Sequence, residues 1–307
     1  MSDDTARLPW STEQWAALRS VVQESARKAR VASSFLPLYG PLPRDQVTVP
    51  ALTMESPELG DRQRGEPPAR LEINDAETLR LTTIAADVYL KTAEAADPDL
   101  EAAKAMVGRA ADVLGRLEDA IVFNGQPEAA QAPVREDGSP FVVPVIYTVR
   151  GGQQHPGLLD TELEVAVPFR ELDGRSETLV SGVVEAIEML EGRGHYGPFA
   201  CVLGHELFLA ANTPNRNSLV LPSDRILPFL EGPLLRSSTL PANLGVVVAL
   251  SGSPIDLVVA TDLDVQFVQL TLEPRYVLRV SERFVLRMKE PDAVCRLVAE
   301  PASGDRG

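Results

Sequence analysis

The fold class is indicated most clearly by one run of residues and those just before it, Glu282-Arg-Phe-Val-Leu-Arg-Met-Lys-Glu-Pro-Asp-Ala-Val-Cys-Arg-Leu297. From Tyr276 to Met288, apolar and polar side chains alternate along the chain. The apolar set is Leu278, Val280, Phe284, Leu286 and Met288, and the polar set is Arg279, Ser281, Arg283 and Arg287. Such alternation predicts a strand with one buried face, and only Glu282 breaks it.

Helices are predicted elsewhere in the chain. Ser11 followed by Gln14 predicts a capping box at the start of an amphipathic helix. Asp97-Pro98 predicts the start of a long spine helix, which Asn124-Gly125 ends. A further helix is predicted over 176–191, and strands are predicted over 141–149, 199–203, 246–250, 255–260 and 265–272. The predicted class is α+β, with one spine helix and an antiparallel sheet.

The charge balance restricts the possible partners. The net charge is −15, although 44% of residues are hydrophobic and 24% are charged, which are ordinary values. Nucleic acids and anionic lipids are bound mainly through excess Lys and Arg, so the sequence argues against both as partners. No apolar run approaches the ~18 residues that span a bilayer, and the acidic N-terminus does not have the layout of a signal peptide. Cys201 and Cys295 lie in apolar stretches and are expected to be buried thiols. We therefore expect a cytoplasmic protein that does not contact a membrane.

The sequence offers no motif for catalysis, a cofactor or a metal. Gly192-Arg-Gly194-His-Tyr-Gly197 matches the dinucleotide fingerprint, but it follows a predicted helix and precedes a strand, which is the reverse of the cofactor motif. His205-Glu206 begins like a zinc motif, but Leu209 stands where the second histidine is needed. We therefore predict no catalytic residue, no cofactor and no metal. An unrelated soluble enzyme remains an alternative, because paired carboxylates can come from anywhere in a chain.

A polar stretch from Leu52 to Ala76 is rich in Pro and Gly. It is too long for an ordinary loop in a compact domain. It is therefore either disordered or used for contacts outside its own domain.

Five segments, in order along the chain, resemble the encapsulins, which are bacterial and archaeal nanocompartment shell proteins with the HK97-type phage-capsid fold. Ser11-Thr-Glu-Gln-Trp15 is similar to the family's N-terminal helix, and Tyr39-Gly-Pro41 to its Gly-Pro turn. Leu117-Glu-Asp-Ala-Ile-Val-Phe-Asn-Gly125 resembles the end of its spine helix. Gly194-His-Tyr-Gly-Pro-Phe199 resembles the entry into its axial-domain strand, and the segment from Glu282 to Val294 resembles its closing strand. No single motif is highly specific, but their order over nearly the whole chain favours membership.

The resemblance implies an HK97-type fold with a peripheral domain, an axial domain and an extended loop. Residues 1–51 would form the N-terminal helix and arm of the peripheral domain, and 52–79 the extended loop between subunits. Residues 80–144 would continue the peripheral domain with the spine helix and an insertion, 145–246 would form the axial domain, and 247–307 the C-terminal peripheral sheet and tail.

The same resemblance implies a function. The chain would be a structural subunit that self-assembles into an icosahedral nanocompartment in the cytoplasm. Its partners would be further copies of itself and a cargo enzyme, either a ferritin-like iron-storage protein or a peroxidase, held through a C-terminal targeting peptide. The alternative is a major capsid protein of a phage or prophage with the same fold. A helix that begins near residue 11, without a longer scaffolding region or arm, argues against that alternative, as does the acidic charge.

Family members hold the cargo peptide in a groove beside the N-terminal helix, on the inner wall. By resemblance, Trp15, Leu18 and Val22 would present apolar surface to the peptide, or would simply pack on their own domain. Many members have a basic residue and an Asp flanking a Val pair after this helix, whereas this chain has Ser33-Ser-Phe-Leu-Pro37. The cargo peptide is therefore expected to differ at this point.

A polar loop falls where family members line the five-fold pore. Its central residues are Asn215, Arg216 and Asn217, which would suit the passage of small hydrophilic solutes. A plain surface loop is the alternative. The chain also departs from the family over 126–156, where it carries a longer insertion.

Overall fold

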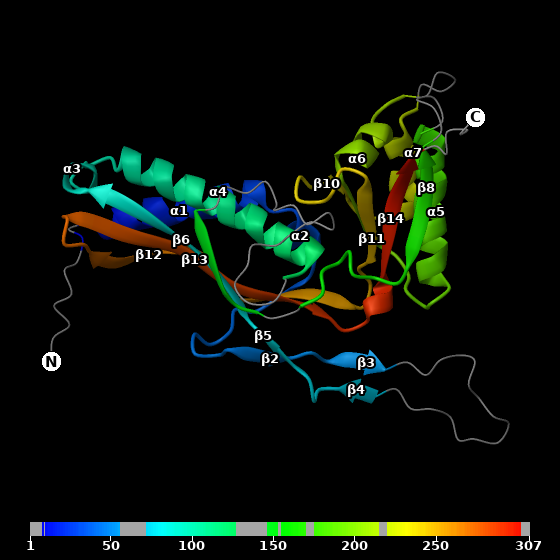
Figure 1. Cartoon of the computed structure of the whole chain (residues 1–307), viewed down its shortest axis with the longest axis horizontal. Coiled ribbons are helices and arrows are strands. Elements are labelled where there is room, and N and C mark those ends of the chain that lie inside the picture. The colour runs from blue at the N-terminus through cyan, green and yellow to red at the C-terminus, as the bar shows by residue number, and fades with distance from the viewer. Residues whose placement is uncertain are drawn as a thin grey trace.

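The structure, a computed structural model, describes residues 8, 10–55, 72–126, 146–152, 155–169, 175–214 and 220–301. Two five-stranded sheets stand next to each other, and a narrow ribbon extends away from them (Figure 1). The first sheet has the order β1 (Leu38–Tyr39), β12 (Ile255–Leu270), β13 (Arg275–Met288), β6 (Thr82–Lys91) and β7 (Tyr147–Gly151). Its strands pair antiparallel, except that β1 runs parallel to β12.

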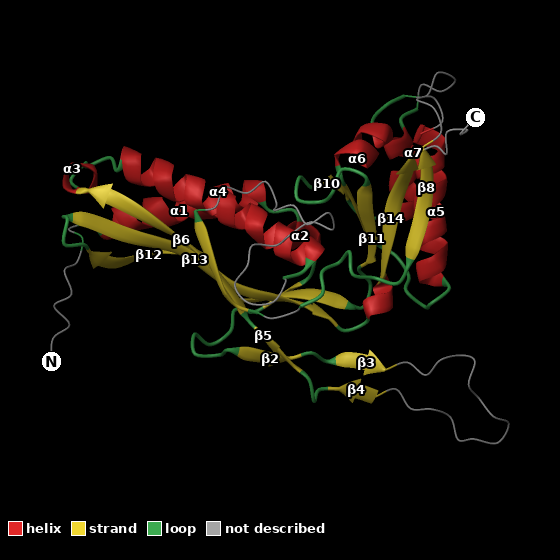
Figure 2. Ribbon diagram, in the orientation of Figure 1, coloured by secondary structure: helices red, strands yellow, loops and turns green. Residues whose placement is uncertain are grey.

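Helices α1 (Thr12–Ala29) and α4 (Glu101–Asn124) lie on one face of the first sheet, as the colouring by type makes clear (Figure 2). The short α2 (Ala32–Phe35) follows α1, and α3 (Thr92–Ala95) follows β6. Buried apolar side chains fill the space between helices and sheet, among them Leu18, Leu114, Leu117, Ile84 and Phe284. This layer of helices on a sheet is the α+β arrangement that the sequence predicts.

The predicted capping box starts α1. The Ser11 side chain accepts a hydrogen bond from the Gln14 amide at 3.2 Å, and the Gln14 side chain accepts one from the Ser11 amide at 2.9 Å. Together these bonds satisfy two donors that a helix end leaves open. The long helix α4 ends at Asn124-Gly125 as predicted, but it begins at Glu101, because Leu100 has a left-handed backbone conformation (φ +51°) that cannot continue the helix toward Asp97. The Asp97 side chain accepts a hydrogen bond from the Glu101 amide at 3.0 Å.

Replacing Ser11 with alanine is expected to lower the free energy of unfolding by about 0.5–2 kcal/mol, because the Gln14 amide loses its acceptor. Urea unfolding followed by circular dichroism measures the change. Ser20→Ala, at an exposed position of the same helix, is the matched control and is expected to be nearly neutral. Equal stability of the two variants would contradict this role for Ser11.

The alternating run forms β13 and buries the predicted face. Leu278, Val280 and Phe284 are completely buried in the main core. The opposite face is partly covered as well, because Val285 packs with Val49 and other residues at the base of the ribbon. The chain predicted as two strands over 255–260 and 265–272 forms the single strand β12, with register shifts between Val259 and Asp264.

The run from Glu282 to Leu297 does not close the first sheet as one strand. Strand β13 ends at Met288, the 3-10 turn Pro291–Ala293 follows, and β14 (Val294–Pro301) enters the second sheet. The physical reason is Pro291, which has no amide hydrogen to continue a strand ladder. Strand β14, from the segment 247–307, therefore lies in the second sheet, and β7, from the segment 145–246, lies in the first sheet.

The second sheet has the order β10 (Leu234–Arg236), β9 (Phe199–Leu203), β11 (Leu244–Ala249), β14 and β8 (Glu164–Phe169). Helix α5 (Arg175–Glu191) packs against this sheet, and α6 (His205–Ala211) and α7 (Pro222–Leu230) lie near it (Figure 1). The helix over 176–191 and the strand over 199–203 are thus confirmed. Cys201 and Cys295 are buried free thiols on β9 and β14.

The ribbon consists of two short antiparallel pairs. Strands β2 (Thr48–Pro50) and β5 (Thr78–Arg80) form the first pair, and β3 (Thr53–Glu55) and β4 (Glu72–Asn74) form the second, farther from the sheets (Figure 1). The described ends of the predicted extended loop therefore leave the body as paired strands.

Candidate cargo-binding cavity

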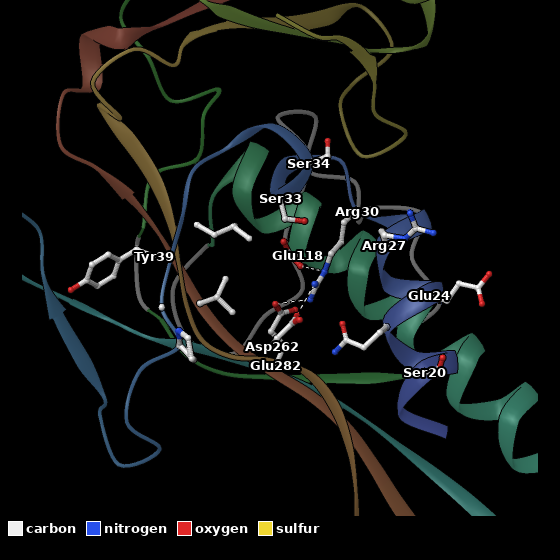
Figure 3. A pocket seen from close by; sticks show the side chains of 15 residues that line it. Ser20, Glu24, Arg27, Arg30, Ser33, Ser34, Tyr39, Glu118, Asp262 and Glu282 are labelled. Atoms are coloured by element: carbon white, nitrogen blue, oxygen red, sulfur yellow. Dashed lines mark hydrogen bonds and ion pairs between the residues drawn. The ribbon is translucent and has the colours of Figure 1, made fainter. Parts of the chain in front are cut away.

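A cavity of about 810 Å³ opens between α1–α2 and the edge of the first sheet (Figure 3). Ser20, Gln23, Glu24 and Arg27 line it from α1. Leu38, Pro41 and Val259 form an apolar wall, with Tyr39 at the edge. Glu118, Asp262 and Glu282 bring carboxyl groups to it from α4, β12 and β13. The cavity therefore combines an apolar wall with an acidic floor.

The residues of α1 that line the cavity are not Trp15, Leu18 and Val22, which the sequence analysis proposed for the groove. Leu18 and Val22 are 0% exposed and face the core, on the stripe that α1 shares with Ala26. Trp15 is half-buried, with its ring edge-on to Trp10 at 5.1 Å between centroids. Of these three side chains, only Trp15 keeps exposed surface. Residues 20, 23, 24 and 27 stand a fraction of a turn away, because successive residues are about 100° apart on a helix.

The segment Ser33 to Pro37, where the family pattern is broken, borders the same cavity. Ser33 and Ser34 line it directly. The segment is held in place by Asp119, whose carboxylate accepts the Val31 amide at 2.9 Å and the Ala32 amide at 2.8 Å. Burial raises the pKa of Asp119 to about 7, although these amide bonds oppose the shift.

The wall of the cavity depends on Gly40. Its φ of +146° is open to glycine but strained for other residues. A β-carbon there would lie 2.0 Å from the Val259 carbonyl oxygen, so no side chain fits. The Gly-Pro turn noticed in the sequence therefore allows β1 to lie directly against β12.

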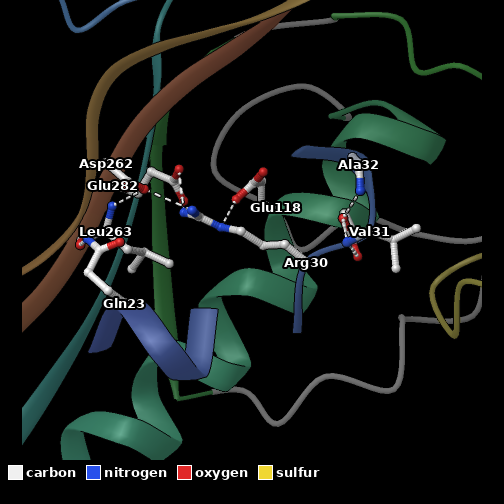
Figure 4. A network of polar contacts seen from close by, with 9 residues as sticks. Gln23, Arg30, Val31, Ala32, Glu118, Asp262, Leu263 and Glu282 are labelled. Carbon is white, nitrogen blue, oxygen red and sulfur yellow. Dashed lines mark hydrogen bonds and ion pairs between the residues drawn. The ribbon is translucent and has the colours of Figure 1, made fainter. Parts of the chain in front are cut away.

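One arginine ties the acidic groups together at the floor of the cavity (Figure 4). Arg30 forms ion pairs with Glu118 through Nε, with Glu282 at 2.6 Å through Nη2, and with Asp262 at 2.8 Å through Nη1. Gln23 donates to the Leu263 carbonyl oxygen at 2.6 Å and joins α1 to the irregular part of β12. The end of α1 is thus attached to α4, β12 and β13 by polar contacts beneath the cavity.

Burial governs the protonation of this cluster. It raises the pKa of Glu118 to about 7, against the opposing pull of Arg30. Burial and the neighbouring Glu118 raise the pKa of Glu282 well above its usual range. For Arg30, burial opposes the charge, but Glu282 and Glu118 outweigh it and raise the pKa. The arginine is therefore always charged, while burial favours the protonated forms of both glutamates.

Sequence reasoning missed these groups, although two signals were present. Glu282 is the one residue that breaks the alternation of β13, and it is 1% exposed. Glu118 lies on the apolar face of α4, one turn from Leu114, and is 0% exposed. A charged residue in an apolar pattern indicates a buried partner. Nothing in the sequence indicated that the partner would be Arg30.

The predicted pore residues Asn215, Arg216 and Asn217 lie outside the described residues. Within the described ranges, no group of three or more His, Cys, Asp or Glu side chains is arranged to hold a metal ion. None of the helices built from these residues has the length and apolar character to cross a membrane.

Comparison with known proteins helps to decide between a nanocompartment shell protein and a phage capsid protein. A family model described as encapsulating protein for peroxidase matches residues 144–285. The chain is 25% identical to the type 1 encapsulin shell protein of Myxococcus xanthus, and the match covers 98% of each protein. It is 26% identical to a diheme-cytochrome-encapsulin shell fusion protein of Kuenenia stuttgartiensis, over 93% of this chain and 72% of that protein.

Solved structures with the same fold include particles of two kinds. The virus-like particle from Pyrococcus furiosus has a TM-score of 0.63 at 16% identity, covering 93% of this chain and 100% of that chain. The capsid of Myoviridae phage XM1 has a TM-score of 0.57 at 13% identity, covering 87% of this chain and 91% of that chain.

The two sheets, the spine helix and the projecting ribbon are those of the HK97-type fold, which these shell and capsid proteins share. The fold alone does not separate shells from phage capsids, since both occur among its structural neighbours. The family model and the full-length relative favour the shells, because the chain is similar to encapsulating shell proteins in both comparisons.

Proposed function

We propose that the chain assembles into a closed icosahedral shell in the cytoplasm and encloses a cargo enzyme, without catalysing a reaction of its own. The observation that carries this proposal is the match to an encapsulin shell protein over 98% of both chains. A match of that extent includes the N-terminal helix, the ribbon and both sheets.

The parts of the fold suggest a division of labour in the shell. The first sheet with α1 and α4 would be the peripheral domain, and the second sheet with α5 to α7 the axial domain. The ribbon, within 52–79, would reach over a neighbouring subunit. The loop with Asn215, Arg216 and Asn217 would line the five-fold pore, and the 126–156 insertion would lie in the peripheral part.

The cavity beside α1 is the proposed cargo groove. Its apolar wall suits a short extended peptide, and Ser33 and Ser34, at the departure from the family pattern, line it. Trp15 would contribute its exposed edge, whereas Leu18 and Val22 would support the helix from beneath. The matched family's description favours a peroxidase as cargo, and a ferritin-like iron-storage protein is the second candidate.

Electron microscopy of the purified protein tests the assembly. We expect closed particles of uniform size in negative stain, with an absorbance ratio at 260 and 280 nm typical of protein. Particles filled with nucleic acid would instead favour a phage capsid. Monomers or small oligomers, with no closed particles, would contradict the proposal.

The cargo is tested by purifying the particles from the native host. Mass spectrometry of the opened particles is expected to show one abundant second protein. Removal of its C-terminal tail is expected to abolish loading without affecting the particles. Uptake that does not depend on this tail would contradict the peptide mechanism but not the shell.

A further inference from the structure

The face of the first sheet that is turned away from α1 and α4 carries a smaller cavity, of about 290 Å³. On β13, Arg279, Ser281 and Arg283 alternate with buried core side chains, so they project from this opposite face into the cavity. Arg150 lines it from β7, and Arg44 lines it from the segment before β2. Four guanidinium groups therefore line one hollow, the arginine cavity, in a protein whose net charge is −15.

The strand register places two of these arginines in one row. Arg283 is the partner of Thr83 on β6, and Thr83 is the partner of Arg150 on β7. The backbones of the two arginines are therefore two strand spacings apart, which is about 10 Å. Like charges on one face of a sheet are unfavourable unless an anion neutralises them.

Carboxylates of the chain neutralise only part of this charge. Asp87 accepts hydrogen bonds from Arg279 Nε and Nη2, at 2.7 and 2.8 Å, and so forms a complete pair. Asp264 lines the arginine cavity, but its Oδ1 lies 3.3 Å from Arg19 Nε of α1 and also accepts from the Val265 amide at 2.8 Å. Its charge is therefore shared with a helix outside the cavity.

Glu282 also lines the arginine cavity, but it does not supply a free carboxylate there. The side chain is 1% exposed, and its Oε1 lies 2.6 Å from Arg30 Nη2. Burial and the neighbouring Glu118 raise the pKa of Glu282 well above its usual range, which favours the uncharged form.

Three arginines of the cavity have no carboxylate partner among the described residues. Arg283 donates to the Arg44 carbonyl oxygen at 2.6 Å and to the Gln46 carbonyl oxygen, which orients its guanidinium group but leaves the charge uncompensated. Within the described part of the chain, the side chains of Arg44 and Arg150 have no hydrogen bond or ion pair. The cavity therefore has an excess of positive charge and of free donors.

We propose that the arginine cavity binds one small phosphate-bearing anion, held by Arg44, Arg150 and Arg283. A guanidinium group presents paired donors whose spacing matches the oxygens of a phosphate. Hydroxyl groups that can donate to the same anion line the cavity, namely those of Thr83, Thr148, Thr261 and Ser281. The volume of about 290 Å³ is at the lower end for ligand pockets, so it suits inorganic phosphate or the phosphate end of a small metabolite.

Two larger partners fit this surface less well. A nucleic acid is bound through many phosphates along a basic track, whereas this is one hollow in an acidic chain. An acidic segment of a neighbouring subunit matches the charge, but a carboxylate side chain offers fewer acceptor oxygens to three guanidinium groups than a phosphate does. The experiment below distinguishes this occupant from a free anion.

Isothermal titration calorimetry of the purified particles, at constant ionic strength, tests the site with inorganic phosphate and with glycerol phosphate. We expect saturable binding of one anion per subunit. Tighter binding of inorganic phosphate would support the free ion as the ligand, and tighter binding of glycerol phosphate would support the phosphate end of a metabolite.

Two variants show whether binding occurs in the arginine cavity. Arg150→Gln keeps a polar side chain on the exposed strand β7 but removes the charge, and is expected to weaken binding about tenfold, since one charge-assisted pair of donors is lost. Arg275→Gln is the matched control, because Arg275 lies on β13 of the same sheet, is 47% exposed and does not line this cavity. It is expected to bind like the parent.

The outcomes separate the anion site from the proposed function. No saturable binding at millimolar phosphate, or an affinity that Arg150→Gln leaves unchanged, overturns the site. Binding by dissociated subunits but not by closed particles, or loss of closed particles in Arg150→Gln, also overturns it and assigns this face to a contact between subunits. If the parent forms no closed particles, the proposed function is overturned, while the same titration of its subunits still decides the anion site.

Discussion

Replacing Arg30 with methionine is expected to lower the free energy of unfolding by about 3–5 kcal/mol, because it leaves buried carboxylates without their cation. Glu118 and Glu282 are 0% and 1% exposed, and Arg30 contacts both. Methionine fills much of the volume of the arginine stem. The loss therefore reports the missing charge and not a large cavity.

The loss is expected to grow with pH. The pKa of Glu118 in the folded chain is about 7, above its ordinary value of 4.5, so folding takes up a proton between these values. A group whose folded pKa is raised contributes stability below its unfolded pKa, and that contribution is lost as the pH rises through the folded pKa. Without Arg30 the folded pKa rises further, so the variant loses more than the parent. Urea unfolding at pH 5 and pH 8 is expected to show a much larger difference at pH 8.

Arg19→Met is the matched control for this experiment. Arg19 lies on the same helix and pairs with Asp264, but both side chains are about half exposed, at 58% and 45%. Exposed pairs contribute little, so this variant is expected to lose less than about 1 kcal/mol at either pH. If Arg30→Met lost as little as Arg19→Met, or lost the same amount at pH 5 and pH 8, the cluster would not be the ionic attachment described above.

The local elements of this fold could be predicted from the sequence, because their signals lie within a few neighbouring residues. The capping box at Ser11, the end of α4 at Asn124-Gly125 and the alternation of β13 are of this kind. The crossing of β14 into the second sheet could not be predicted, since the partners of a strand depend on distant segments. Residues 294–301 pair with β11 and β8, which no local pattern specifies.

The candidate site divides in the same way. The amphipathic pattern of α1 correctly identified an apolar stripe, but the stripe faces the core and the cavity lies on the neighbouring flank. A single chain's pattern does not distinguish residues that bind from residues that pack. The acidic floor comes from three elements far apart in sequence, and only the anomalous placement of Glu118 and Glu282 indicated it.

The second large effect is expected at the ribbon, where Ile73→Asp should prevent assembly. Ile73 is 60% exposed and Met54 is 39% exposed, and the two are direct partners in the β3–β4 pair. They form apolar surface on a two-stranded ribbon that extends away from both sheets (Figure 1). Such a ribbon is marginally stable in water by itself, so the proposed shell would cover it with a neighbouring subunit. An aspartate buried there without a partner is unfavourable at every copy of the contact.

Size-exclusion chromatography and electron microscopy are expected to show subunits or small oligomers of Ile73→Asp in place of closed particles, with an unchanged circular dichroism spectrum. Ile73→Val keeps the apolar surface and the strand preference, and should assemble normally. Ala76→Asp adds the same charge at an exposed turn of the same segment, and should also assemble.

Normal particles from Ile73→Asp would place this face of the ribbon outside any contact between subunits. Loss of particles in Ala76→Asp as well would attribute the effect to charge and not to the apolar face. Because the subunit core does not include this pair, a failure of assembly with intact helices and sheets would locate the defect between subunits and not within one.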